Sequence, residues 1–192
     1  FINLFNFMDG VDGMLASNSI VFSLVGAFAL FWLGHDSLAI MLLLLGASLT
    51  GFLVYNWPPA RVFMGDSGAA FIGYTIAVVA LYSTAEEMMN FWTWIILMGY
   101  FVADTTTTMF IKIATVPGWF YEEHRNHAYQ QLALVWKSHK RVTIMGLGVT
   151  TFWMAPMALL SLRFHQNATI LAVIALAPII ILTLRRGPPF RP

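Results

Sequence analysis

Six apolar stretches, each about as long as a bilayer is thick, limit this chain to a membrane-spanning helical fold. They lie near residues 17–34, 38–55, 68–85, 91–111, 142–162 and 168–184. A helix needs about 20 mostly apolar residues to cross the hydrocarbon core, where every backbone hydrogen bond must be satisfied internally. Of the 192 residues, 59% are hydrophobic and 10% are charged, whereas soluble domains carry about 25% charged residues. We therefore expect an all-α, polytopic membrane protein with about six transmembrane helices.

The same pattern indicates one transmembrane catalytic domain over residues 1–192. The connectors are short apart from residues 112–141, and neither a repeat nor a shift in composition divides the chain. Because the chain opens at Phe1 without a signal-peptide pattern, we interpret it as the C-terminal part of a longer protein. The absence of cysteine excludes disulfides and thiolate catalysis. The net charge of +1, with scattered cations, gives no reason to expect nucleic-acid binding.

The distribution of lysine and arginine predicts the orientation in the membrane. With six spans, both termini and the loops at 56–67 and 112–141 share one side. That side holds nine of the ten cations, and the opposite side holds Arg163 alone. Because cytoplasmic loops carry the excess of Lys and Arg, the first side is expected to be cytoplasmic. The nine cations are Arg61, Lys112, Arg125, Lys137, Lys140, Arg141, Arg185, Arg186 and Arg191.

Three motif loops fall on the predicted cytoplasmic side, and the first reads NLFNFMDGVDG over residues 3–13. In this loop Asn3, Asn6, Asp9 and Asp12 recur at every third position. Helical positions three apart share a face, and amide and carboxylate oxygens are hard ligands that suit Mg²⁺. The alternative is an Asx-rich cap for the span that follows, but four such groups in register favour a ligand site.

The second loop reads PPARVFMGDSG over residues 58–68 and runs directly into a span. Asp66 and Ser67 stand where an N-cap residue belongs, so Asp66 capping a helix is one interpretation. The other is that the free backbone N–H groups, together with a metal on Asp66, bind phosphate. Arg61 would add a cation to that site. The sequence leaves both interpretations open.

The third loop reads EEHRNHAYQ over residues 122–130 and contains His124, Arg125 and His127. Two histidines three residues apart can bind zinc, but the loop offers no obvious third ligand and is basic. Arginine and histidine suit an anionic substrate better, because a guanidinium binds phosphate oxygens in a bidentate manner. The alternative is an ordinary solvated loop that carries positive-inside charge.

Asp104 is the remaining acid close to the predicted cytoplasmic side, near the inner end of the fourth span. A carboxylate at that depth should face protein or water rather than lipid. It either joins the motif loops or only pairs with Lys112. We expect a structural role, supporting the residues that contact substrate.

Taken in order, the three motifs resemble those of the polyprenyl-phosphate N-acetylhexosamine-1-phosphate transferases, which form glycosyltransferase family 4. The patterns NxxNxxDGxDG and PAxVFMGDSG, followed by an HxxH-type loop, occur here in the family's order. The form HRNHAYQ is most similar to the O-antigen-initiating subgroup. These enzymes act in lipopolysaccharide synthesis and cell-wall biogenesis at the bacterial inner (plasma) membrane.

The resemblance implies transfer of an N-acetylhexosamine-1-phosphate, or of a deoxy derivative, from a UDP-sugar to polyprenyl (undecaprenyl) phosphate, with release of UMP. It implies Mg²⁺ as cofactor with Mn²⁺ as an alternative, and membrane lipids as surroundings; it leaves a homodimer open. By resemblance, Asp9, Asp12 and Asp66 are catalytic, with Asp9 orienting substrate or relaying a proton and Asp12 contacting the uridine end. Asn6 and Asp66 would hold the metal, while Asn3, Asp12, His124, Arg125 and His127 would bind substrate.

One departure and two alternatives bear on this interpretation. The family carries an adjacent aspartate pair in an earlier cytoplasmic loop, and this sequence contains no adjacent aspartates. We therefore expect N-terminal spans to be missing and the fragment alone to be inactive. An ion-coupled transporter would place its acids near mid-membrane, whereas these cluster at one face. A non-catalytic membrane paralogue would have eroded motifs, whereas these are nearly intact.

Overall fold

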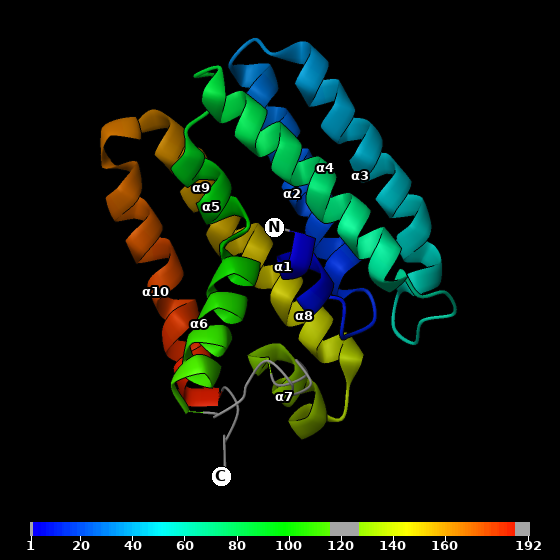
Figure 1. The fold of residues 1–192 in the computed structure, drawn as a ribbon. Helices are drawn as coiled ribbons and strands as arrows, with labels where there is room; N and C mark the ends of the chain where they lie inside the picture. The colour runs from blue at the N-terminus through cyan, green and yellow to red at the C-terminus, as the bar shows by residue number, and fades with distance from the viewer. Residues whose placement is uncertain (1, 116–126, 187–192) are drawn as a thin grey trace.

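The computed structural model describes residues 2–115 and 127–186, and these two ranges are helical without any strand. The all-α prediction is confirmed. Figure 1 shows the helices as a bundle in which elements distant in sequence lie side by side. The elements are α1 (Ile2–Phe7), α2 (Met14–Trp32), α3 (Asp36–Asn56), α4 (Gly65–Ala85), α5 (Phe91–Leu97), α6 (Gly99–Thr115), α7 (Ala128–Trp136), α8 (His139–Val149), the π-helix η2 (Thr150–Met154), α9 (Ala155–Arg163), the 3-10 turn η3 (His165–Asn167) and α10 (Ala168–Arg186).

Five helical segments in the described ranges are long and apolar enough to cross a membrane, and a bent pair makes a sixth. The bent pair corresponds to the span predicted over 91–111, and its bend is a finding of the structure. Helices α5 and α6 meet at an angle of 81°. At the junction a Cβ on Gly99 would lie only 2.8 Å from Leu176 Cδ2 and 3.0 Å from Met154 Sδ. The absence of a side chain at Gly99 thus allows the bent backbone to approach α10 closely.

The outward-facing side chains are those that a lipid environment requires. Large apolar residues are mostly exposed on several spans, among them Leu44 at 65%, Phe71 at 64% and Phe152 at 82%. Soluble monomers rarely expose contiguous apolar patches of this kind. The described helices therefore indicate a multi-pass membrane protein.

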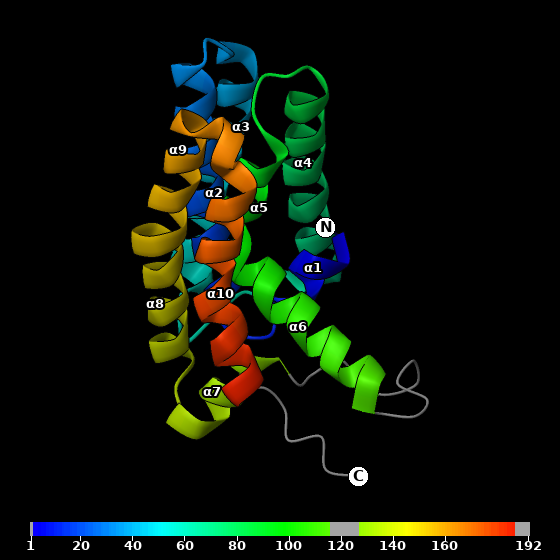
Figure 2. The ribbon, with the colours of Figure 1, turned by 90° about the vertical axis from the view of Figure 1, so that its left-hand side faces the viewer.

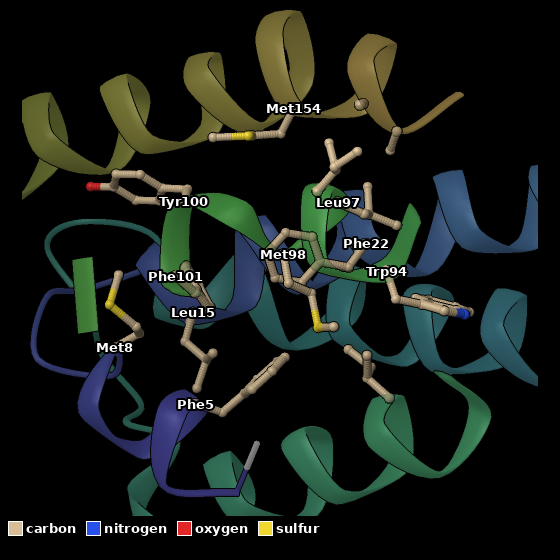
Figure 3. Packing of buried hydrophobic residues seen from close by; sticks show 14 of the residues in the cluster. Phe5, Met8, Leu15, Phe22, Trp94, Leu97, Met98, Tyr100, Phe101 and Met154 are labelled. Atoms are coloured by element: carbon tan, nitrogen blue, oxygen red, sulfur yellow. The ribbon is translucent and has the colours of Figure 1, made fainter. Parts of the chain in front are cut away.

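An aromatic cluster fixes the short helix α1 inside the bundle. Phe5 packs edge-to-face on Phe22 of α2 and on Phe101 of α6, with ring centroids 6.2 and 5.6 Å apart, and Phe22 and Phe101 are 5.1 Å apart. Figure 3 shows these rings meeting in the core. Edge-to-face contacts between aromatic rings stabilise a fold in addition to the stabilisation that comes from burying apolar area. On its other side, α1 packs so closely on α4 that a Cβ on Gly73 would lie 3.0 Å from Phe5 Cβ. The chain that follows α1 is thereby held at one end of the bundle.

A π-helical turn interrupts the span that follows α7. Within η2 the Thr150 hydroxyl donates to Asn18 Oδ1 of α2, and both residues are buried. Such turns insert one residue into an α-helix and are frequent at functional sites. Here the turn joins α8 to α9, and its bond to Asn18 holds the C-terminal end of α8 against α2.

Candidate functional site

Residues 8–13, which we term the acidic loop, connect α1 to α2. The sequence predicts one helical face for Asn3, Asn6, Asp9 and Asp12, but α1 ends at Phe7, so both aspartates lie in the loop. At that end the Tyr129 hydroxyl donates to the Phe7 carbonyl at 2.7 Å. Carbonyls in the last turn of a helix have no partner within the helix, and the Tyr129 hydroxyl supplies one here.

The start of α7 also holds the middle of the acidic loop. The Gly10 N–H donates to the Tyr129 hydroxyl at 3.0 Å, and Gln130 Nε2 donates to the same oxygen at 3.2 Å. A Cβ on Gly10 would lie 2.5 Å from the Tyr129 hydroxyl and 2.3 Å from Gln130 Nε2. Burial raises the pKa of Tyr129 above its ordinary value, so this hydroxyl stays neutral and able to donate.

Asp12 links the acidic loop to the second motif loop and to α8. Its Oδ2 accepts from the Ala60 N–H at 3.1 Å, and its Oδ1 lies 3.3 Å from His139 Nδ1. The Thr143 hydroxyl donates to the Asp12 carbonyl at 2.7 Å. Gly13, whose φ of 71° is left-handed, donates its N–H to Asn56 Oδ1 at 3.0 Å. These bonds join segments up to 131 residues apart in sequence.

Asp66 is exposed in the first turn of α4, and the capping interpretation is wrong. The helix begins at Gly65, its N-cap is Met64, and no side chain makes a capping hydrogen bond there. The sequence places the N-cap at Asp66, whereas the structure has it two residues earlier, at Met64, so Asp66 lies inside the helix. Its carboxylate instead lies at the positive end of the α4 dipole.

Asp9 lies close to Asp66 in a more enclosed position. Burial first, and the negative charge of Asp66 second, raise the pKa of Asp9 from 3.8 to about 7. The negative charge of Asp66 therefore disfavours a charged Asp9, and a cation near both carboxylates would relieve that repulsion. Asn6 stands on the last turn of α1, at the same end of the bundle.

The donor set at this end suits magnesium better than zinc. In the described parts of the chain, no group of three or more His, Asp or Glu side chains converges to hold a metal. Mg²⁺ commonly takes only one or two carboxylates, keeps several waters and completes its shell with substrate phosphates. Asp66, Asp9 and the Asn6 amide are oxygen donors of that kind, so they fit a phosphate-bound Mg²⁺, and the metal remains a prediction.

The third motif loop is described only in part. His124 and Arg125 lie outside the described residues. His127 is buried at the N-cap of α7, where its backbone N–H donates to Gln130 Oε1 at 3.2 Å. The His127 ring stacks on Phe7 with centroids 5.7 Å apart and planes at 29°. The last turn of α1 and the third motif are therefore in direct contact.

Asp104, on α6, contacts the start of α7 beside His127. Its Oδ1 accepts from the Ala128 N–H at 3.1 Å and from the Thr183 hydroxyl at 3.2 Å. Its Oδ2 lies 4.0 Å from His127 Nδ1. Of the two sequence interpretations, these contacts favour a link to the motif loops. Asp104 thereby ties α6, α7 and α10 together.

The predicted site residues therefore separate into groups. The structure brings Asp9 next to Asp66, Asp12 against the second loop, and His127 against α1, whereas Asn3 is exposed on α1. Sequence reasoning missed the residues that hold these groups in place. They are Asn56, Tyr129, Gln130 and Thr143, together with His139 as the partner of Asp12. Tyr129 and Gln130 lie two and three residues after His127 in the third motif, and that position was the available signal.

Comparison with known proteins gives a consistent result. Residues 1–84 match glycosyl transferase family 4. The phospho-N-acetylmuramoyl-pentapeptide-transferase of Shouchella clausii is 38% identical over 163 residues, covering 81% of this chain and 44% of that protein. Its counterpart in Staphylococcus carnosus is 32% identical over 115 residues, covering 60% of this chain and 34% of that protein.

A third relative carries a different name. The probable undecaprenyl-phosphate N-acetylglucosaminyl 1-phosphate transferase of Bacillus subtilis is 35% identical over 114 residues, covering 58% of this chain and 32% of that protein. The chain thus spans less than half the length of each of these three relatives. The matches support the family inferred from the three motifs, while the O-antigen-initiating subgroup remains a prediction.

Proposed function

We propose that this chain, which the comparisons support as a member of glycosyl transferase family 4, forms the part of a polyprenyl-phosphate sugar-1-phosphate transferase that carries these three motifs. The substrates would be a UDP-N-acetylhexosamine, or a deoxy derivative, and undecaprenyl phosphate. One observation carries the proposal. Gly10 bonds to Tyr129 of the third motif and Asp12 to Ala60 of the second. Gly13 bonds to Asn56 at the end of α3, and Asp12 also contacts His139 at the start of α8.

In the proposed reaction, a phosphate oxygen of the lipid attacks the β-phosphorus of the UDP-sugar and UMP leaves. Negative charge accumulates on the phosphoryl oxygens, so catalysis rests on positioning and charge neutralisation. Mg²⁺, held by Asn6 and Asp66, would neutralise the diphosphate and stabilise the departing oxygen. Asp66 at the N-terminus of α4 places this charge beside backbone N–H groups that bind phosphate oxygens.

The other residues have proposed roles that follow from where they lie. Asp9, beside Asp66, would orient the substrate or relay a proton. Asp12 would contact the uridine end while its bond to the Ala60 N–H holds the loop in shape. His127, with His124 and Arg125, would grip the diphosphate and the sugar. Asn3, exposed at the start of the site, would complete substrate binding.

The location follows from the same proposal. The excess of Lys and Arg in the loops at this end of the bundle supports a site on the cytoplasmic side of the bacterial inner membrane, where UDP-sugars are made. For the sugar we propose the O-antigen-type N-acetylated deoxyhexoses or N-acetylglucosamine, on the strength of the HRNHAYQ motif. The names of the relatives add N-acetylmuramoyl-pentapeptide as the competing candidate.

The test is release of UMP by the natural full-length polypeptide with undecaprenyl phosphate and Mg²⁺. The panel contains UDP-N-acetylglucosamine, a UDP-N-acetylated deoxyhexose and UDP-N-acetylmuramoyl-pentapeptide. We expect turnover with one of the first two. Turnover with the pentapeptide substrate alone would refute the subgroup, and no turnover with any member would refute the reaction. The same assay on the 192-residue chain tests whether it is inactive alone.

A further inference from the structure

The last turn of α7 presents an apolar surface that faces away from the bundle. Leu134 is 69% exposed, Val135 67% and Trp136 37%, whereas Tyr129 and Leu132 nearer its start are buried. We call these three exposed residues the α7 tip. The proposed transfer reaction does not use the tip. Three consecutive large apolar side chains left in water would be unfavourable, by about 25 cal/mol for each Å² that stays exposed.

The α7 tip lies where a membrane span begins. Only Lys137 and Ser138 separate Trp136 from the span His139–Arg163. Lys137 has a left-handed φ of 49°, which turns the chain sharply between the two helices. Both ribbon views show α7 at the end of the bundle beside the start of α8 (Figures 1 and 2). The tip is therefore at the level where the chain leaves the hydrocarbon core.

The charge around the tip identifies the surface that would cover it. Lys137, Lys140 and Arg141 are exposed and follow the tip directly. The sequence contains no acid between Ala128 and Thr150. Ile144, one turn after these cations, is 50% exposed and continues the apolar surface towards the membrane. Tryptophan at the interface and a cluster of Lys or Arg beside it are the features that bind an anionic lipid leaflet.

We propose that the α7 tip inserts into the headgroup region of an anionic phospholipid leaflet, with Lys137, Lys140 and Arg141 bound to the lipid phosphates. The opposite end of α7 carries His127 and the Tyr129 and Gln130 contacts to the acidic loop. A lipid anchor at one end of this nine-residue helix therefore fixes the height of the candidate site above the membrane.

The depth of the tip is directly measurable because the chain has no native cysteine. The V135C variant carries a nitroxide label and is placed in phosphatidylcholine–phosphatidylglycerol liposomes. The frequency of collisions of the nitroxide with O₂ is compared with that of its collisions with a water-soluble nickel chelate. L44C, at an exposed position midway along α3, is the lipid control, and E86C, exposed between α4 and α5, is the water control. We expect V135C to collide with O₂ more than E86C does, and with nickel less.

Two results would overturn the proposal. Nickel access at V135C equal to that at E86C would place the tip in water. Protection from both reagents would mean that protein covers it, as in contact with a second copy of the chain. Both measurements concern a surface that the proposed transfer reaction does not use, so failure here leaves the proposed function intact.

The lipid charge is tested in the same label background. Liposomes of phosphatidylcholine alone, or the variant K137Q/K140Q/R141Q, should raise nickel access at V135C, because each cation near an anionic surface strengthens adsorption about fivefold. L44C in the same triple variant reports whether the spans still insert. If L44C stays lipid-embedded and V135C is as protected as before under both conditions, the cations do not bind lipid and the proposal is wrong.

Discussion

The two ends of the helical bundle have similar polar loops but hold them in very different ways. At the end that carries the motifs, the Tyr129 and Thr143 side chains and the Ala60 backbone N–H bond to the acidic loop or to the end of α1 across 48 to 131 residues of sequence. At the opposite end, the Asn90 side chain bonds only two residues along the chain, to the Trp92 N–H. Among the described residues at that end, the side chains of His35, Glu86 and His165 make no hydrogen bond or ion pair and are partly or fully exposed.

The difference shows what distinguishes a candidate site from a solvated loop in this molecule. Charge alone does not, because Asp36 and Asp66 are both exposed acids in the first turn of a span helix. Long-range bonds do, because they fix the relative positions of residues that must act on one substrate. Substitutions at matched positions of the two ends therefore test the account.

The largest expected effect is that of D66N compared with D36N. In the full-length protein, D66N should lower UMP release by about a thousandfold, because losing a metal ligand removes several kcal/mol of transition-state stabilisation. D36N removes an equivalent charge at a helix N-terminus, and its rate of UMP release should stay within about twofold of that of the unsubstituted protein. Similar rates for the two variants across a range of Mg²⁺ concentrations would show that Asp66 is an ordinary helix-start acid.

The next effect is on stability and compares D104A with N90A. D104A removes the acceptor for the Ala128 N–H and the Thr183 hydroxyl, and leaves both buried. Unpaired buried donors cost about 1–3 kcal/mol each. N90A removes only a helix cap, worth about 1 kcal/mol. The unfolding temperature in detergent should therefore fall further for D104A than for N90A. An equal or smaller fall for D104A would show that Asp104 does not hold the helices together.

A smaller effect is expected for Y129F against Y82F. Removing the Tyr129 hydroxyl leaves the Gly10 N–H and the Phe7 carbonyl without their partner. We expect a loss of about 1–3 kcal/mol of stability and slower turnover, since the acidic loop is released from α7. Tyr82 is 50% exposed at the opposite end of the bundle, so Y82F serves as the control and should change neither. Unaltered stability and rate in Y129F would mean that the loop is held by other contacts.

The smallest effect separates H139Q from H165Q. The His139 ring, 49% exposed, pairs with Asp12 at 3.3 Å, and partly exposed ion pairs contribute about 0–1 kcal/mol. H139Q should therefore lower the unfolding temperature slightly, and more so at low salt, whereas H165Q should not change it. A large loss in H139Q would indicate that the Asp12 contact contributes far more than its exposure suggests.

The spans could be predicted because they depend on local sequence. Five of the expected spans appear as long apolar helices, because hydrophobicity over about 20 residues is a direct consequence of bilayer thickness. The bend between α5 and α6 could not be predicted in this way. Gly99 permits it only because α10 and Met154 press against that position, and those contacts are long-range.

The candidate site divides in the same manner. The residue types at Asp9, Asp12 and Asp66 were readable from the motifs, but their geometry was not. The helical register expected over the first motif stops at Phe7, whose carbonyl accepts from Tyr129, 122 residues away. The proximity of Asp9 to Asp66 likewise depends on α1 packing against α4, which no local pattern encodes.

Convergence of the motif loops at one end of the bundle is the central claim, and cross-linking tests it most directly. In the cysteine-free chain, D12C/H139C joins positions 127 residues apart whose side chains contact each other. D36C/H139C joins α3 and α8 at opposite ends of the bundle. Under mild oxidation in native membranes, we expect a rapid intramolecular disulfide in D12C/H139C and none in D36C/H139C. Failure of D12C/H139C to cross-link in correctly inserted protein, or equal cross-linking of the two pairs, would contradict the account.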